Sequence, residues 1–366
     1  MLRIRNVLTE SPQPTVDDFD DKDLSKGFNP KKERGFSADA RRLWETYFEF
    51  LVKGGNYNLL KRLKGKLKKA EVGMCGIDDL YKFLMKKDEE INNENLLKLL
   101  LVRPDDTDME DYLKLIPKNP SKKCKEKLKW IFNYSTATKK AIFKEFVYLL
   151  GVPVCPYCGR AFTTTAKLKR GAFHKTNQID HFIPQADYPH LALSIWNLIP
   201  SCASCNLTKS NEDFKNLPYP YAEGFGDLYR FNFDVTKSLD YMIEFGTSVD
   251  WKPSLTEYGN GDDSEVELLR KLKNEAQMLH IEELYSSHAN YVRDICLQRM
   301  IFNDAYIDEM LENFKGYFKS REEVRRLLYM KSIDSDRIGS IPLDKLTRDI
   351  DMQIEALIKK SRLDLI

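Results

Sequence analysis

The stretch "QIDHFIPQADYPHLALSIWNLIPSCASCNLTKS", residues 178–210, contains an Asp-His pair, an Asn, and a Cys-x-x-Cys that runs into Asn-x-x-Lys. A second Cys-x-x-Cys stands upstream in "CPYCGRAF", residues 155–162. The whole chain of 366 residues contains only seven Cys and five His. Four of the seven cysteines therefore bracket a single Asp-His pair, and this arrangement governs the fold expected for the central part of the chain.

The two cysteine pairs, Cys155 with Cys158 and Cys202 with Cys205, have the spacing of a zinc site. A tight turn lets both thiolates of a pair face one ion, and two pairs complete the tetrahedral set that Zn²⁺ prefers. Gly159 favours the left-handed turn that would close the first pair. We expect a structural zinc with no open coordination position, and four unrelated core cysteines are the alternative. The other three cysteines are expected to be buried thiols.

The residues between the pairs suit a different metal. Asp180 is a hard oxygen donor of the kind that binds Mg²⁺ or Mn²⁺. His181 follows it in a β-like run, and an imidazole with a pKa of about 6.5 can accept a proton at neutral pH. Adjacent side chains on a strand point to opposite faces, so the strand must twist or end here if both are to serve one site. Pro184 favours such an end.

Two asparagines accompany this pair. Asn206 is expected near the start of a helix, either as a second oxygen ligand or as the helix N-cap. Asn197 is expected in a loop, as a brace. In the structural alternative, His181 is a satisfied packing histidine and Asp180 is a turn residue or a support for the zinc site. The remaining histidines have no comparable neighbours and are expected at the surface or in packing roles: His174, His190, His280 and His288.

Residues 155–215 resemble the HNH endonuclease family. The resemblance lies in the order of their motifs: Cys-x-x-Cys, Asp-His, Asn-Leu and Cys-x-x-Cys-Asn-x-x-Lys. The resemblance implies a ββα-metal fold, in which a β-hairpin and a helix hold one divalent ion. It also implies that His181 is the general base, that Asp180 and Asn206 hold the ion, and that Asn197 braces the loop and helps to orient the base. Many members have His where this chain has Asn206, a weaker ligand.

A looser resemblance concerns the setting of the motif. The segments "NYSTATKKAIFKEFVYLLGVPVCPYCGRAF" and "DHFIPQADYPHLALSIWNLIPSC" resemble bacterial HNH proteins found beside ATPases in anti-phage systems. This resemblance implies an anti-phage effector with a regulatory partner such as an ATPase.

Positive charge is concentrated upstream of and within this module. The chain carries a net charge of only +2, but residues 113–175 contain fifteen Lys or Arg and two Glu. Such a patch suits the phosphate backbone of a nucleic acid, although the densest run can also be a solvated helix face. We expect backbone contacts from Arg160, Lys167, Lys169, Arg170 and Lys209.

The chain as a whole is expected to be an α+β protein, with mainly α-helical flanking regions around a small zinc-stapled ββα-metal module. We divide it into an extended N-terminal arm (1–35), a helical region (36–151), the module (152–220) and a mainly helical C-terminal region (221–366). Ser37 is the expected N-cap of the first long helix, and Gly151 ends the last helix before the module. No apolar run is long enough for a membrane span and no secretory signal is apparent, so we expect a cytoplasmic protein.

Together these features predict a metal-dependent endonuclease that cleaves DNA in preference to RNA. Because an uncontrolled nuclease is toxic, we expect control by a partner protein, by homo-oligomerisation or by a ligand. Two alternatives stay open. One is a zinc-stapled module that binds nucleic acid without cutting it, and the other is a scaffold for a partner ATPase.

Overall fold

The computed structural model describes residues 2–52, 58–73, 75–118, 120–234, 251–259, 261–334 and 337–363. The chain divides into two compact units. We call Ile4–Val152 with Thr163–Lys215 the N-terminal unit, and Met1–Arg3 with Pro153–Phe162 and Asn216–Ile366 the C-terminal unit. Among the described residues, no helix has both the length and the apolar character needed to cross a membrane.

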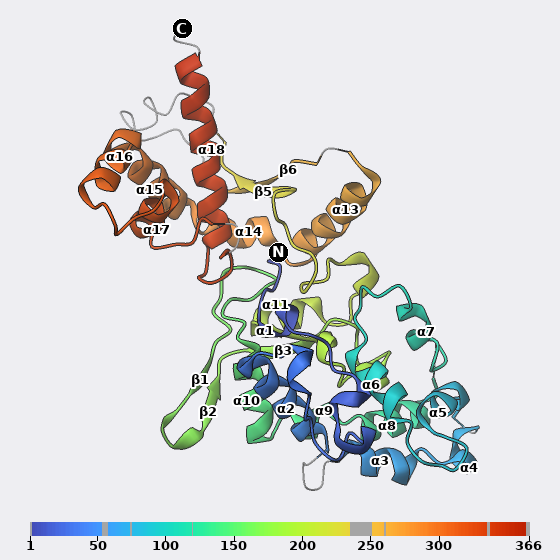
Figure 1. Ribbon diagram of the computed structural model, residues 1–366. Coiled ribbons are helices and arrows are strands. Elements are labelled where there is room, and N and C mark those ends of the chain that lie inside the picture. Colours follow the sequence, from blue (N-terminus) through green and yellow to red (C-terminus); the bar gives the residue numbers. More distant parts are fainter. Residues whose placement is uncertain are drawn as a thin grey trace. The chain divides into compact units, whose positions relative to one another are not determined.

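Helices make up most of the N-terminal unit (Figure 1). They are α1 (Val7–Glu10), α2 (Ala38–Val52), α3 (Leu59–Lys66), α4 (Lys69–Val72), α5 (Asp78–Leu84), α6 (Asn93–Leu101), α7 (Met109–Leu113), α8 (Lys122–Ile131), α9 (Tyr134–Ala137), α10 (Ala141–Leu150) and α11 (Ala203–Lys209).

The ends of α2 and α10 follow the local sequence signals. The Ser37 hydroxyl accepts a hydrogen bond from the amide of Ala40 at 3.1 Å, as an N-cap does. Gly151 ends α10 with a φ of 61°, a left-handed conformation that favours glycine. The two helices pack together through aromatic rings, with Phe50 and Phe146 at 5.5 Å between centroids. Both rings are fully buried, so this contact is part of the core of the N-terminal unit.

The segment over residues 1–35, expected as an extended arm, is packed instead. Leu8 is fully buried, and its helix α1 contacts α2. Phe19 and Phe28 both lie against Phe48 of α2, with ring centroids 4.7 and 5.9 Å away. The polar composition of the segment concealed these widely spaced apolar anchors, whose burial offsets the cost of ordering the chain around them.

Among the described residues, the strands form three two-stranded antiparallel sheets: β1 (Thr165–Lys167) with β2 (Phe173–Lys175), β3 (Gln178–His181) with β4 (Leu198–Ser201), and β5 (Tyr229–Asn232) with β6 (Ser254–Glu257). In the second sheet, Asp180 is opposite Ile199 and His181 is opposite Leu198. Helix α11 follows β4 directly and contacts β3. Strands β3 and β4 and helix α11 thus form the expected hairpin and helix.

The C-terminal unit is mainly helical. In the part of this unit that the structure describes, the α-helices are α13 (Asp263–Met278), α14 (Ile281–Ser286), α15 (Ala289–Ile301), α16 (Asp304–Asn313), α17 (Arg321–Tyr329) and α18 (Asp344–Leu363).

The first Cys-x-x-Cys turn packs within this unit. Gly159 has the expected left-handed conformation, with a φ of 64°. Tyr285 donates a hydrogen bond to the carbonyl of Cys158 at 2.7 Å, and the amide of Leu343 donates one to the carbonyl of Gly159 at 2.8 Å. A Cβ at position 159 would lie 3.1 Å from the Tyr285 hydroxyl, so the close approach also favours glycine.

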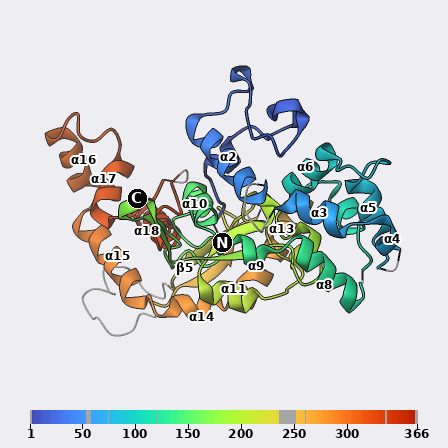
Figure 2. The same ribbon diagram turned by 90° about the horizontal axis from the view of Figure 1, so that it is seen from below.

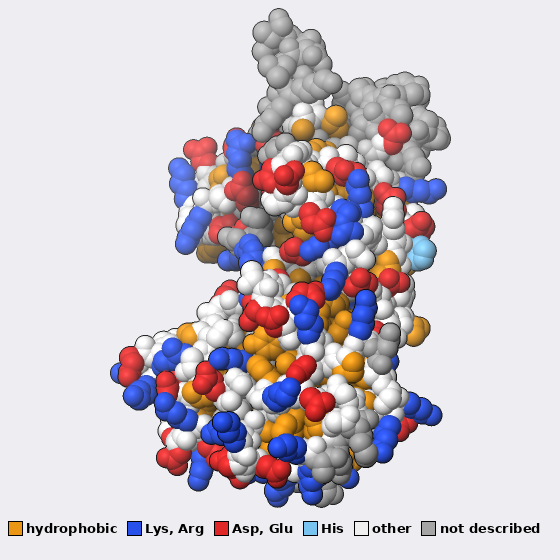
Figure 3. Space-filling view, turned by 90° about the vertical axis from the view of Figure 1, so that its right-hand side faces the viewer, with side chains coloured by type: hydrophobic (Ala, Val, Ile, Leu, Met, Phe, Trp, Pro, Cys, Tyr) orange, Lys and Arg blue, Asp and Glu red, His pale blue; other side chains and the backbone are white. Residues whose placement is uncertain are grey.

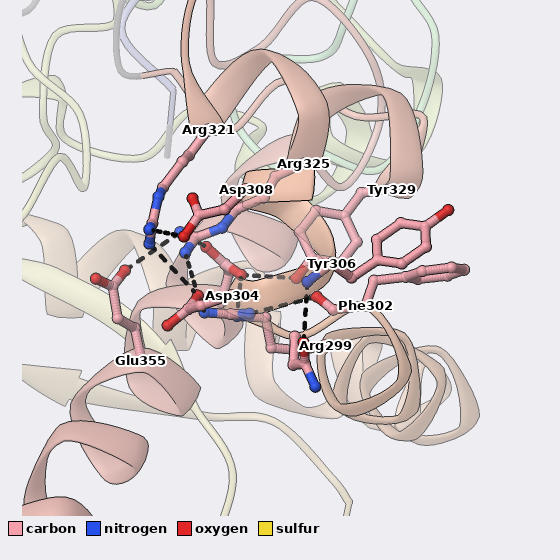
Figure 4. Close-up of polar contacts among 11 residues, drawn as sticks. Arg299, Phe302, Asp304, Tyr306, Asp308, Arg321, Arg325, Tyr329 and Glu355 are labelled. Carbon is pink, nitrogen blue, oxygen red and sulfur yellow. Dashed lines mark hydrogen bonds and ion pairs between the residues drawn. The ribbon is translucent and has the colours of Figure 1, made fainter. Parts of the chain in front are cut away.

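Helices α15 to α18 are joined by buried ion pairs as well as apolar contacts (Figure 4). Arg325 pairs with Asp351 at 3.3 Å, and Tyr329 donates a hydrogen bond to the same carboxylate at 2.6 Å. Arg299 pairs with Asp304 at 2.5 Å. Because these cations and carboxylates neutralise one another, the network fits a structural role.

Surface charge elsewhere is mixed in sign. On the face shown in Figure 3, Lys and Arg side chains alternate with Asp and Glu side chains. This mixture agrees with the small net charge of the chain.

The structure as a whole, with helical flanks and small two-stranded sheets, confirms the α+β class.

Candidate active site

The four paired cysteines form one cluster. Their Sγ atoms all lie within 4.8 Å of one another. Cys155, Cys158 and Cys205 are buried, and Cys202 is half-buried. A zinc ion with Zn–S bonds of about 2.3 Å places its four sulfurs about 3.8 Å apart, so the observed cluster has the right donors and nearly the right dimensions.

A pocket of about 630 Å³ lies beside the β3–β4 hairpin, and Asp180, His181 and Asn206 all line it. Strand β3 ends at His181, so the alternation of side chains no longer separates this residue from its neighbour. The N-cap of α11 is Cys202, whose sulfur accepts from the amide of Cys205 at 3.5 Å. Asn206 lies inside the helix, so the N-cap alternative for this residue is wrong.

The imidazole of His181 is fixed on two sides. Its Nε2 lies 2.9 Å from the carbonyl oxygen of Ala192. Because a carbonyl only accepts, Nε2 carries the proton and Nδ1 is left as the basic nitrogen. The ring of Tyr134 meets the imidazole edge-on, with 4.3 Å between ring centroids. The ring can therefore present Nδ1 in one orientation.

Burial also sets the charge of His181. It lowers the pKa of the imidazole, while the hydrogen bond to Ala192 and the charge of Asp180 partly oppose this effect. The side chain is consequently neutral at physiological pH, which is the state a general base requires. Burial raises the pKa of the Tyr134 hydroxyl, so this neighbour stays protonated and uncharged.

The carboxylate of Asp180 is buried and paired with Lys209. The ammonium lies 3.1 Å from Oδ2, and it also donates to the backbone carbonyls of His181 and Phe182 at 3.1 and 3.3 Å. Lys209 is fully buried, at 0% exposed. The expectation that it contacts a phosphate backbone is therefore wrong for this arrangement, because its charge is directed inward to the end of β3.

Asn206 faces the pocket from α11. Its Nδ2 donates to Oε1 of Gln178 at 2.7 Å, which uses the amide nitrogen and leaves the oxygen as a ligand atom. The pocket thus has two hard oxygen donors, from Asp180 and Asn206, which suit a divalent cation such as Mg²⁺.

Asn197 is buried and braces the loop between β3 and β4. Its Oδ1 accepts from the amide of Ile183 at 2.6 Å, and its Nδ2 donates to the carbonyls of Ile183 and Leu191 at 3.2 and 3.1 Å. Leu191 precedes Ala192, whose carbonyl holds the imidazole of His181. Asn197 therefore braces the loop whose Ala192 carbonyl holds the imidazole of His181.

The basic residues expected to bind a backbone fall into two groups. Lys167, Lys169 and Arg170 are exposed around the turn of the β1–β2 hairpin, which projects from the N-terminal unit (Figure 1). Arg160 is half-buried, and its Nε donates to Nε2 of His288 at 3.0 Å. The first group is placed for a backbone contact, whereas Arg160 is engaged in packing.

One wall of the pocket comes from helices that the motifs did not indicate. Helix α8 and the start of α9, both labelled in Figure 2, supply five residues that line the pocket: Glu126, Lys129, Trp130, Asn133 and Tyr134. The run "KCKEKLKW", residues 123–130, is dense in charge, but only the tertiary packing shows that three of its residues line the pocket.

Comparison with known proteins agrees with this geometry. Residues 155–212 match the family model described as HNH endonuclease. The chain is 35% identical over 60 residues to protein ea31 of Escherichia phage lambda, which covers 16% of each chain. It is 28% identical over 106 residues to Septu protein PtuB of Bacillus thuringiensis, which covers 28% of this chain and 38% of the relative. No solved structure gave a significant match.

Proposed function

Because the chain carries an HNH endonuclease domain at residues 155–212, we propose that it is a metal-dependent endonuclease that hydrolyses phosphodiester bonds in DNA. The observation that carries the proposal is that Asp180, His181 and Asn206 line one pocket, with the imidazole held so that Nδ1 is the basic nitrogen. We assign the activity to residues 152–220, between helical regions over 36–151 and 221–366.

In the proposed reaction, Nδ1 of His181 takes a proton from a water molecule, whose oxygen then attacks the phosphorus. The bond between phosphorus and the leaving ester oxygen breaks, and that oxygen takes up a proton from solvent. The Ala192 carbonyl keeps the ring in place during the transfer. The nearby carboxylate of Asp180 then stabilises the imidazolium that forms. Asn197 keeps the loop that supplies this carbonyl in position.

Asp180 and Asn206 would hold the catalytic ion, Mg²⁺ or Mn²⁺. When bound, such an ion neutralises charge on the phosphate and stabilises the leaving oxygen. The residues fit this role because they offer a carboxylate and an amide oxygen to the same pocket. Lys209 fixes the carboxylate of Asp180 from the buried side.

Cys155, Cys158, Cys202 and Cys205 would hold Zn²⁺. A four-thiolate site leaves no position for substrate, so this ion serves structure alone. It ties residues 155–158 to residues 202–205, the segment that precedes and begins α11. The zinc therefore helps to position Asn206, which immediately follows Cys205.

DNA is the proposed substrate, in preference to RNA, and the exposed basic turn of the β1–β2 hairpin is its proposed backbone contact. We propose a defence role in the cytoplasm, with control by a partner such as an ATPase or by homo-oligomerisation. The similarity to Septu protein PtuB supports the defence role.

Nicking of supercoiled plasmid by the purified chain tests the activity. We expect nicking with Mg²⁺ or Mn²⁺, none with EDTA, and a loss of at least about 100-fold in His181→Ala, the range lost when a general base is removed. If wild type and His181→Ala are equally inert with either ion and with any activating partner present, the chain is a binding module or a scaffold instead.

A further inference from the structure

Helix α8 presents a polar and aromatic face to the catalytic pocket. Glu126, Lys129 and Trp130 are spaced at i, i+3 and i+4, so they share one face of the helix, and all three line the pocket. The opposite face is buried through Cys124 and Leu128. The helix is thus anchored on one side and available to a ligand on the other.

The indole of Trp130 is the exposed centre of this face. Its exposed fraction is 43%, which is unusual for the largest apolar side chain. The guanidinium carbon of Arg62 lies 4.5 Å from the ring centroid, and the ammonium of Lys66 lies 5.4 Å from it. Arg62 also donates a hydrogen bond to the Trp130 carbonyl. Two cations from α3 therefore lie over the aromatic ring of Trp130 on α8.

The charges of this face favour an anionic ligand. In the part of the chain that the structure describes, no ion pair joins Lys66 or Lys129 to an acidic side chain. Glu126 adds one negative charge to the face, and the three cations Arg62, Lys66 and Lys129 outnumber it. An aromatic ring among excess cations is the combination that binds single strands of nucleic acid, since bases stack on the ring and phosphates contact the cations.

We propose that Trp130, with Arg62, Lys66 and Lys129, forms a stacking subsite for an unpaired nucleobase of the strand being cut. The inference rests on the proposed nuclease function, because it places this base beside a phosphate held at Asp180 and His181 in the same pocket. A base inside an intact duplex is stacked on both faces by its neighbours and cannot stack on an indole. The favoured substrate is therefore DNA with a locally unpaired strand.

Binding to two probes tests this subsite. The full chain is used with the substitution His181→Ala, so that the oligonucleotides are not cleaved. Fluorescence anisotropy then gives the affinity of this chain for a single-stranded oligonucleotide and for the matched perfect duplex. We expect Trp130→Ala in this background to weaken binding of the single strand by roughly 5- to 150-fold, the value of one base–aromatic stack. Binding of the duplex should change by less than about twofold, since duplex affinity comes mainly from phosphate contacts.

Two further variants serve as matched controls. Trp130→Phe keeps an aromatic face and should restore most of the affinity for the single strand. Tyr317→Ala removes another aromatic ring, which is 83% exposed and does not line the pocket, and it should leave both affinities unchanged. Circular dichroism of each variant shows that the fold is retained.

Three results would overturn the subsite: no effect of Trp130→Ala on the single strand, an equal loss on both probes, or no measurable binding of the single strand at all. Failure of the proposed nuclease is read separately, as absence of plasmid nicking by the wild-type chain. If the wild-type chain does not nick plasmid but Trp130→Ala selectively weakens binding of the single strand, the subsite stands as a single-strand-binding site without nuclease activity.

Discussion

At the residue scale, Tyr134 is the neighbour that limits the motion of the proposed base. Its edge-on contact with His181 leaves the imidazole little freedom beyond the orientation set by the Ala192 carbonyl. Tyr134→Leu should lower kcat about tenfold with little change in KM, because a mobile base spends less time in the reactive geometry. Tenfold corresponds to about 1.4 kcal/mol, at the upper end for one aromatic contact.

The measurement is the rate of DNA cleavage at saturating substrate with Mg²⁺, and the matched control is Tyr134→Phe, which keeps the ring and should retain at least half of the rate. If the phenylalanine variant loses as much as the leucine variant, the hydroxyl has a role of its own and the positioning account is incomplete. If neither variant changes kcat, Tyr134 does not position the base.

Lys209 and Asp180 form a buried ion pair whose loss can be measured as stability. Lys209→Met leaves a carboxylate in the interior without its ammonium, and removing one partner of a buried pair typically costs about 3–5 kcal/mol. We expect the free energy of unfolding to fall by about this amount in urea titrations with EDTA. A divalent ion at Asp180 would supply part of the missing positive charge.

Mg²⁺ should therefore stabilise Lys209→Met more than it stabilises the wild-type chain. The matched control is Lys215→Met, since Lys215 pairs with Glu110 on the surface and its loss should cost less than about 1 kcal/mol. Equal stabilisation of the wild-type and Lys209→Met chains by Mg²⁺ would argue against an ion at Asp180.

His190 links stability to pH. It is buried, its Nε2 bonds the carbonyl of Tyr112 at 3.0 Å, and burial lowers its pKa to about 4. The unfolded chain has an ordinary histidine pKa of about 6.5, so below that pH it binds a proton that the folded chain excludes. The stability contributed by the neutral imidazole is complete above pH 6.5 and is lost as the pH falls toward 4.

The difference between the two pKa values corresponds to about 2–3 kcal/mol of unfolding free energy between pH 7 and pH 4. Urea titrations at several pH values should show this decline, and His190→Gln should flatten it. His174→Gln changes an exposed histidine and should leave the decline intact. A decline of the same size in His190→Gln would assign it to other groups.

At the scale of elements, the β1–β2 hairpin is the part that salt should affect most. Lys167, Lys169 and Arg170 are exposed, and Tyr148 of α10 packs on Phe173 of β2 to support the hairpin. If each cation neutralises one phosphate, changing all three to alanine should reduce the slope of log K against log [salt] by about 2.7.

Binding isotherms over a series of NaCl concentrations give this slope, and Arg160→Ala is the matched control because its side chain packs against Tyr285 and His288. An unchanged slope in the triple variant would remove the hairpin from the proposed interface. A loss in Arg160→Ala as large as one phosphate contact would show that this arginine also binds the backbone.

Local signals predicted elements better than they predicted packing. Ser37 and Gly151 marked helix ends correctly, because capping depends on residues a few positions away. The burial of Phe19 and Phe28 was missed, because scattered apolar anchors in a polar segment have no period. The pocket-facing side of α8 was missed for a related reason, since the spacing of charged residues along a helix does not indicate which part of the fold they contact.

The same contrast applies within the candidate site. The clustering of the two cysteine pairs was predictable from their spacing, and the adjacent residues Asp180 and His181 both line the pocket, as expected of neighbours at the end of a strand. The burial of Lys209 was not predictable, since the sequence pattern is the same whether a lysine on a helical turn is exposed or directed inward. Tyr134 and Trp130 come from outside the matched region, so they enter the site only through the fold.

At the scale of the whole molecule, the cysteine cluster ties together two segments distant in sequence, around residues 155–158 and 202–205. Because zinc binds the folded chain and not the separated segments, its binding energy adds to the free energy of folding. Cys202→Ser removes one of the four thiolates, and the weakened site should lose its ion. We expect the zinc content to fall from one per chain toward zero and Tm to drop by at least about 10 °C.

Inductively coupled plasma mass spectrometry gives the metal content, and a thermal melt followed by circular dichroism gives Tm. The matched control is Cys296→Ala, which removes a buried thiol of α15 that lies outside the cluster. That variant should lose some stability through the cavity it leaves but should retain one zinc per chain. Retention of zinc by Cys202→Ser, or its absence from the wild-type chain, would contradict the four-thiolate site and would leave Asn206 to be positioned by α11 alone.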